Sequence, residues 1–140
     1  MKVAYKDLIN FLSETPSKEE LSEKLFQLGH EHEIHDEIFE MELTPNRGDC
    51  FSLMGIARDL NIFFGNTQPI EIYEGDIESL EIDFRNLSPI DCPKISFLEI
   101  EIEDEKNGYK PYLRNFFNSI GGNRTNLFTD ISNYISYELG

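Results

Sequence analysis

The chain has 140 residues, enough for one domain of ordinary size or two small ones with a modest core. Its 27 acidic and 12 basic side chains give a formal net charge of −15, opposite in sign to the Lys- and Arg-rich surfaces that bind phosphates. This balance argues against non-specific nucleic-acid binding and against adhesion to an anionic membrane, and it favours solubility or docking onto a basic partner.

Cysteine usage and the apolar runs point to the compartment. Cys50 and Cys92 are too few for a disulfide framework and make no metal site by themselves. No apolar run approaches the roughly 20 residues that span a bilayer, and the N-terminus lacks a signal-peptide pattern. We therefore expect a cytoplasmic protein with reduced thiols.

The first third of the chain predicts two helices. Residues 5–14 carry Leu8, Ile9 and Leu12 on one helical face. After a break at residues 15–16, Ser17 and Glu20 match a capping box, in which Ser17 accepts from the Glu20 amide and the Glu20 carboxylate reaches back. The second helix then continues to Gly29, which ends it in a left-handed conformation. Its apolar face consists of Leu21, Leu25 and Leu28.

A strand, a corner and a further helix are predicted next. Phe39, Met41 and Leu43 share one strand face. The six residues that follow predict a turn with Pro and Gly fixing the backbone and the last residue as helix N-cap: Thr44, Pro45, Asn46, Arg47, Gly48 and Asp49. The helix after them has a wide apolar stripe of Leu53, Ile56, Ala57, Leu60, Phe63 and Phe64, and Gly65 stops it.

The second half of the chain predicts strands followed by helices. Residues 66–79 read as a linker with a brief strand near Ile70 and Ile72. Alternating apolar residues predict strands at 80–84 and at 98–102, the latter with an acidic outer face, and residues 106–108 predict a turn. Pro111 opens a helix that ends at Gly121-Gly122, and a final helix is capped by Thr129 or Asp130.

This order of elements predicts an α+β fold in two small units. Residues 1–70 form a helix-rich N-terminal module, and residues 75–140 form an incomplete α+β unit with too few strands to close a core by itself.

With these elements placed, residues 41–60 resemble one segment of the β chain of bacterial phenylalanyl-tRNA synthetases. In that family a strand leads into a Thr-Pro-Asn-Arg-x-Asp-Cys turn and then a Gly-Ile-Ala-Arg-x-Leu helix, and Thr44–Cys50 and Gly55–Leu60 fit without a gap. Residues 92–94 resemble the Cys-Pro-Arg opening of the family's editing domain, and residues 128–140 resemble its Asp-Val-Thr-Asn-Tyr to Glu-Leu-Gly segment.

The chain also departs from the family pattern. The OB-fold module that the family associates with tRNA binding is absent between Gly29 and Met41. Arg124 is displaced by one position, and Leu127 replaces an Asn. The family's Gln-Pro-x-His-Ala-Phe-Asp stretch, with its editing histidine, would follow Gly140. The resemblance therefore implies an N-terminal part of the β chain that ends inside the editing domain.

The resemblance implies that aminoacylation resides in the α chain, and that ATP and Mg²⁺ bind the whole enzyme elsewhere; no cofactor, metal or catalytic residue is expected in this segment. Asn133 matches an editing-pocket residue and Ser132 stands where Thr is usual. The alternative for Asn133 is a helix-surface or capping residue. The expected partners are the synthetase α chain and the rest of the β chain, with tRNA only in the whole assembly.

Three motifs leave alternatives open. The Thr44–Asp49 turn is either a binding loop or a rigid corner in which Arg47 pairs with a nearby acid, and we favour the corner. His30, His32 and His35 lie among acidic residues and are either metal ligands or a solvated polar edge, which we favour. An acidic row is either a docking surface for a basic partner or a solvated strand face that discourages edge-to-edge association. It consists of Glu99, Glu101, Glu103, Asp104 and Glu105.

Three functions follow from these observations. The leading hypothesis is a scaffolding segment of a synthetase β chain, inactive alone. The second is a truncated or free-standing hydrolase that clears mischarged tRNA. The third is a degenerate paralogue repurposed as an acidic protein-binding module. Whether the chain is an enzyme by itself is left open, and copurification with an α chain or a deacylation assay discriminates the hypotheses.

Overall fold

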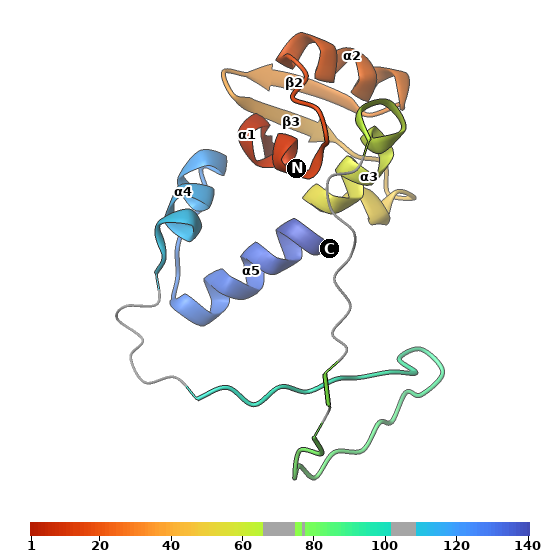
Figure 1. Ribbon diagram of the computed structural model, residues 1–140, viewed down its shortest axis with the longest axis vertical. Helices are drawn as coiled ribbons and strands as arrows, with labels where there is room; N and C mark the ends of the chain where they lie inside the picture. Colours follow the sequence, from red (N-terminus) through yellow and green to blue (C-terminus); the bar gives the residue numbers. More distant parts are fainter. Residues whose placement is uncertain (66–74, 77, 102–108) are drawn as a thin grey trace.

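The computed structural model describes residues 1–65, 75–76, 78–101 and 109–140. These residues form helices around a small three-stranded sheet, which confirms the predicted α+β class (Figure 1). The strands are β1 (Lys2–Ala4), β2 (Glu31–His35) and β3 (Ile38–Glu42). The helices are α1 (Tyr5–Leu8), α2 (Lys18–Gln27), α3 (Leu53–Phe64), α4 (Pro111–Ile120) and α5 (Leu127–Leu139), with 3₁₀ turns η1 (Ile9–Phe11) and η2 (Gly48–Cys50).

The sheet has the order β1-β3-β2, and both pairs are antiparallel. Phe39 and Met41 of β3 are buried, as their alternation predicted, whereas Glu40 and Glu42 are exposed on the opposite face. The strand β1 was not predicted, because three residues carry little periodicity. Its place is set by pairing with β3, where Val3 lies opposite Phe39.

The predicted helix over residues 5–14 is shorter in the structure. It consists of one α-turn, α1, and the 3₁₀ turn η1, and it ends at Phe11. The Leu12 backbone is extended, yet its side chain is buried together with that of Leu8. The apolar spacing therefore identified the buried residues correctly and overestimated the length of the helix.

The helix α2 has the predicted ends. The Ser17 hydroxyl accepts from the Glu20 amide at 3.1 Å, so one bond of the capping box is present. Gly29 has a φ of +81°, in the left-handed region that favours glycine. Leu21 and Leu25 of this helix are buried in a core that also contains residues of β1, α1, β3 and α3.

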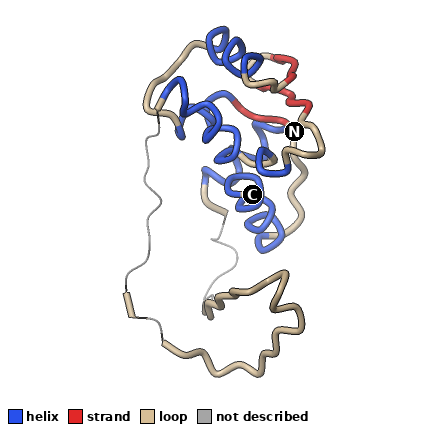
Figure 2. The backbone as a smooth tube through the Cα atoms, turned by 90° about the vertical axis from the view of Figure 1, so that its right-hand side faces the viewer, coloured by secondary structure: helices blue, strands red, loops and turns tan. Residues whose placement is uncertain are grey.

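The strands predicted at 80–84 and 98–102 are wrong for the described residues. Residues 78–101 form a long loop that runs away from the helices (Figures 1 and 2). Apart from a turn at residues 89–91, this loop has no regular secondary structure. Phe84 and Phe97 touch, with ring centroids 4.8 Å apart, but no backbone ladder joins their segments. A strand is stable only with a hydrogen-bonded neighbour, and alternation alone does not supply one.

Several predictions for this part of the chain lie outside the described residues. They are residues 66–74 and 77 of the predicted 66–79 linker, the brief strand near Ile70 and Ile72, and the turn at 106–108. Within the acidic row, Glu99 and Glu101 are described and exposed, whereas residues 103–105 are not described.

The helices α4 and α5 form a second apolar cluster. It contains the buried side chains of Leu113, Phe116, Phe117 and Leu127. Pro111 opens α4 as predicted, and Gly121 ends it with a φ of +66°. The predicted cap of α5 is wrong: Asn126 caps it by accepting from the Thr129 amide at 3.0 Å. Asp130 is instead buried, where it accepts from the Thr125 amide and the Tyr109 hydroxyl.

The two C-terminal helices pack against the N-terminal module. The helix α5 contacts α3, and α4 contacts β1. Tyr137 lies against both apolar clusters, and the Ser119 hydroxyl on α4 donates to Asp7 on α1 at 3.4 Å. The two predicted units therefore meet along their helices; the predicted boundary between them, over residues 70–75, remains a prediction.

Candidate functional site

The corner after β3 is a tight, hydrogen-bonded turn, as predicted. The Arg47 amide donates to the Thr44 carbonyl at 2.9 Å, and the Cys50 amide donates to the Arg47 carbonyl at 2.9 Å. Pro45 and Asn46 form the turn, and η2 follows directly. Gly48, however, does not fix the backbone as predicted, because its φ lies outside the left-handed region and a Cβ there would meet open space.

A different glycine, Gly55, holds the corner against α3. A Cβ at Gly55 would lie 1.9 Å from the carbonyl oxygen of Asp49 and 3.1 Å from the Cα of Cys50. The backbone of η2 therefore crosses the first turn of α3 in direct contact. Asp49 is consequently not the N-cap of α3: Ser52 takes that place, and its hydroxyl accepts from the Gly55 amide at 3.1 Å.

Arg47 is the centre of an ionic network beneath the corner. Its Nη2 donates to Asp59 Oδ2 at 2.5 Å and to Cys50 Sγ at 2.8 Å, and its Nε donates to Asp49 Oδ1 at 3.1 Å. Arg58 donates to the carboxylates of both Asp49 and Asp59. The predicted pairing of Arg47 with a nearby acid is confirmed, and the network ties the corner to α3.

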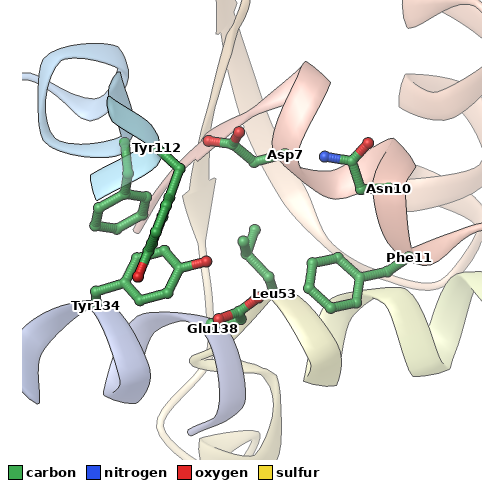
Figure 3. A pocket seen from close by; sticks show the side chains of 8 residues that line it. Asp7, Asn10, Phe11, Leu53, Tyr112, Tyr134 and Glu138 are labelled. Carbon is green, nitrogen blue, oxygen red and sulfur yellow. The ribbon is translucent and has the colours of Figure 1, made fainter. Parts of the chain in front are cut away.

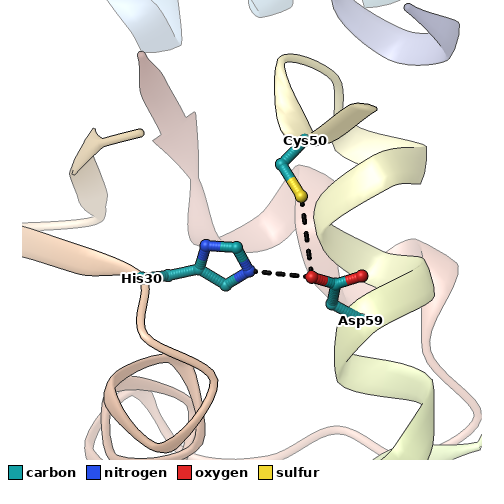
Figure 4. Close-up of side chains that lie close together, drawn as sticks. All are labelled: His30, Cys50 and Asp59. Atoms are coloured by element: carbon teal, nitrogen blue, oxygen red, sulfur yellow. Dashed lines mark hydrogen bonds and ion pairs between the residues drawn. The ribbon is translucent and has the colours of Figure 1, made fainter. Parts of the chain in front are cut away.

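His30 extends this network to the segment before β2. Its ring is only 3% exposed, and Nε2 lies 3.1 Å from Asp59 Oδ2. Figure 4 shows His30 and Cys50 approaching Asp59 from two sides. The three side chains each offer a potential ligand atom, and these atoms lie within 4.8 Å of one another.

The electrostatics of the network favour ionised carboxylates and a protonated thiol. Burial alone would raise the pKa of Asp59, but hydrogen bonds from Arg47, Arg58 and His30 outweigh it, so the pKa is lowered. Hydrogen bonds from Arg47 and Arg58 lower the pKa of Asp49. Burial, together with the charge of Asp59, raises the pKa of the Cys50 thiol to about 11. Cys50 is therefore a poor nucleophile.

The same arrangement argues against a metal ion at His30, Cys50 and Asp59. The Arg47 guanidinium already touches both the sulfur and the carboxylate that a metal would need. The positive charge beside Cys50 and Asp59 is therefore supplied by Arg47 of the chain itself.

The histidines singled out in the sequence do not converge. His32 stacks on Phe26 with ring centroids 4.3 Å apart, and its Nε2 bonds with the Ser22 hydroxyl at 2.8 Å. His35 is exposed and lies 3.3 Å from Glu33. The favoured solvated edge is wrong for His30, which is buried. His32 Nδ1 also bonds with the His30 carbonyl at 2.9 Å, but only the ring of His30 joins the ionic network.

The residues assigned to an editing pocket lie on the surface. Ser132 and Asn133 are both exposed on α5. The neighbouring Tyr134 instead lines a cavity of about 260 Å³ between α1, α3, α4 and α5 (Figure 3), and Ser132 and Asn133 are not among the described residues that line it. Their editing role stays a prediction.

Sequence reasoning placed Arg58 and Asp59 within the family motif but gave them no role, and it did not single out Ser52. A signal for Asp59 is present, since this acid stands between the buried Ala57 and Leu60 in an otherwise apolar stripe. An acid at such a position needs a basic partner, but the sequence does not reveal that Arg47 and His30 supply it.

Comparison with known proteins finds relatives among the β subunits of phenylalanine–tRNA ligase. The chain is 37% identical over 112 residues to the phenylalanine–tRNA ligase β subunit of Gluconobacter oxydans, a match that covers 77% of this chain and 13% of that protein. The corresponding values are 37% over 112 residues for Rickettsia felis, covering 76% and 13%, and 31% over 115 residues for Bartonella henselae, covering 76% and 14%.

These matches confirm the resemblance to the β chain of phenylalanyl-tRNA synthetase over about three quarters of the chain. The chain spans roughly an eighth of the length of these relatives, which are matched over 13% of their length. No family model and no solved structure matches. Among the described residues, the helices are too short and too polar to cross a membrane.

Proposed function

We propose that this chain acts as a structural module of a phenylalanyl-tRNA synthetase β chain and helps to hold the α/β enzyme together. The observation that carries the proposal is the similarity to named β subunits over 77% of the chain, which includes relatives at 37% identity. The chain's part is then assembly, and the chemistry of the enzyme belongs to other segments.

The corner supports a structural role. Arg47, Asp49, Arg58 and Asp59 bind one another and His30, so the polar groups of the corner are largely engaged within the chain. A catalytic site instead presents reactive groups to a substrate, with a base beside a nucleophile. The one nucleophile of the corner, Cys50, is buried and held protonated.

The long loop supports a role in assembly. Leu87, Ile90 and Leu98 are 80%, 92% and 82% exposed, and five further large apolar side chains between residues 82 and 100 are at least 44% exposed. Single exposed apolar residues are ordinary, but eight large ones within one irregular segment favour an interaction surface. We propose that the synthetase subunits cover this loop in the assembled enzyme.

Co-expression with the cognate α chain tests the proposal. The tagged 140-residue chain should retain the α chain through affinity purification and gel filtration. The triple variant Leu87→Ser, Ile90→Ser, Leu98→Ser should weaken binding by at least about tenfold, because burial of even one of these side chains contributes roughly 1.5–3 kcal/mol. These side chains are exposed, so the variant should keep the circular dichroism spectrum of the wild type.

Ile62→Ser on α3 is the matched control, since Ile62 is 77% exposed and lies outside the loop. It should bind the α chain like the wild type. If the folded wild-type chain binds no α chain, alone or with the remainder of the β chain, the scaffolding role is wrong. If Ile62→Ser weakens binding as much as the triple variant, the loop is not the docking surface.

The remaining expectations follow from this assignment. Aminoacylation, ATP, Mg²⁺ and tRNA are proposed to belong to the whole synthetase, in the cytoplasm. The alternative of an editing hydrolase gains no support from the positions of Ser132 and Asn133, which are exposed and lie outside the cavity. Deacylation of mischarged phenylalanine tRNA, sensitive to Asn133→Ala, would establish that alternative instead.

A further inference from the structure

The cavity between the two parts of the chain has a composition that scaffolding does not require. It measures about 260 Å³ and is lined from the N-terminal side by Asp7 of α1 and Phe11 of η1. The C-terminal helices contribute Tyr112 and Phe116 of α4 and Tyr134 and Glu138 of α5. The lining thus combines aromatic rings with two acids, and the described lining residues include no Lys or Arg.

The aromatic residues form a connected wall. The ring centroids of Tyr112 and Tyr134 are 5.6 Å apart, and those of Phe116 and Tyr134 are 5.0 Å apart with planes at 84°. In Figure 3 the Tyr112 and Tyr134 rings stand on one side of the space and the Phe11 ring stands on the other. Ring faces carry partial negative charge, so rings on several sides of one space create a favourable place for a cation.

The two carboxylates act on the same space. Burial and a hydrogen bond with Glu138 raise the pKa of Tyr134, and the negative charge of Asp7 acts in the same direction, so both acids lie near this ring. Burial raises the pKa of Asp7 and outweighs both the charge of neighbouring Lys6 and the bond from the Ser119 hydroxyl, which is long at 3.4 Å. The ionised form of Asp7 would therefore gain from a further cation on the cavity side.

We infer that this cavity binds an organic cation, an alkylammonium or guanidinium group, with Asp7 and Glu138 as charge partners and Tyr112, Phe116 and Tyr134 as the aromatic wall. The two acids supply charge-assisted hydrogen bonds, and the rings supply cation–π attraction. The cavity is slightly smaller than the pockets of about 300–1,000 Å³ that hold drug-sized ligands, so it fits one amine-bearing group. The net charge of −15 attracts cations and repels anions.

Titration of the full chain with small cations tests this inference. Isothermal calorimetry and tyrosine fluorescence are followed with n-butylamine, N-ethylguanidine and choline at physiological ionic strength. At least one should bind saturably, and 3,3-dimethyl-1-butanol, the uncharged counterpart of choline, should not. Asp7→Asn and Glu138→Gln should each weaken binding by about tenfold, the loss expected for one charge-assisted hydrogen bond.

Two further variants separate the cavity from the general acidity of the surface. Glu31→Gln removes the same charge from an exposed position on β2 and should leave the affinity unchanged. Tyr112→Leu removes one ring from the wall and should weaken binding several-fold without unfolding, since Tyr112 is 57% exposed. Circular dichroism verifies that each variant is folded.

The source of the cation is resolved by a second set of ligands. Short peptides that contain one Lys or Arg are compared with the free amines. Tighter binding of a peptide, still sensitive to Asp7→Asn, identifies the natural occupant as a basic side chain of a protein partner; equal or tighter binding of the free amine identifies a small metabolite. The inference is overturned if neither class binds the folded chain, or if Glu31→Gln weakens binding as much as Glu138→Gln.

Discussion

Gly55 allows the most direct test of the corner, because it is the point where η2 and α3 touch. Replacing it with Ala places a methyl group 1.9 Å from the carbonyl oxygen of Asp49 and 2.9 Å from its carbonyl carbon. The obstacle is backbone on both sides, so it cannot be relieved by turning a side chain. The corner must move away from α3, and the bonds of Asp49 to Arg47 and Arg58 are disturbed with it.

The expected loss of stability follows from two opposing effects. Overpacking a close contact costs about 1–3 kcal/mol, and a backbone clash lies at the upper end of this range. Replacing Gly by Ala in a helix returns up to about 1 kcal/mol of conformational free energy. Gly55→Ala should therefore lower the free energy of unfolding by about 2 kcal/mol, which lowers the melting temperature by several degrees in a chain of this size.

Gly48→Ala is the matched control for this experiment. It makes the same chemical change seven positions earlier in the sequence, where an added Cβ meets open space and φ is not left-handed. It should leave stability within about 0.5 kcal/mol of the wild type or raise it slightly. Urea unfolding followed by circular dichroism measures both variants. Equal stability of the two would refute the close packing of η2 on α3.

Three further predictions concern single side chains. Ser52→Ala should destabilise the chain by about 1 kcal/mol through loss of the α3 cap, whereas Ser132→Ala on exposed α5 should not; urea midpoints decide, and equal midpoints would contradict the cap. Iodoacetamide at pH 8 should alkylate half-buried Cys92 well before Cys50, whose pKa burial raises to about 11, and equal rates in the folded chain would contradict this. The folded chain lowers the pKa of Asp59 below 3.8, so the ionised carboxylate stabilises the fold above that pH, and this contribution is lost as the pH falls through the lower folded value. Asp59→Asn should therefore flatten the fall of the urea midpoint between neutral pH and about pH 3. An unchanged slope would count against the ionic network as a source of stability.

The parts of the fold that the sequence predicted are those governed by neighbouring residues. Ser17 and Glu20 are three positions apart, and Gly29, Gly65 and Gly121 each end a helix through their own backbone angles. Such signals need no knowledge of distant parts of the chain, since capping and left-handed φ values are local properties. The pairing of Arg47 with an acid was likewise predictable in kind, though not the identity of Asp59.

The parts that failed depend on distant contacts. Asp49 and Ser52 are both good N-cap residues, and the choice between them was made by η2 and by its contact with Gly55. The segments at 80–84 and 98–101 alternate like strands, but alternation specifies the faces of a strand and not the neighbour that must pair with it. Ser132 and Asn133 were placed by resemblance alone, and nothing in their spacing indicated which side of α5 would face the cavity.

The packing of α5 on α3 and of α4 on β1 has a consequence for the integrity of the molecule. The last helix completes a core that begins at Val3, because Tyr137 lies against the same cluster. A protease that cuts the exposed loop within 78–101 would sever the polypeptide without touching these contacts. The two pieces should then co-elute as a nicked complex, and two separately expressed halves should reassemble when mixed.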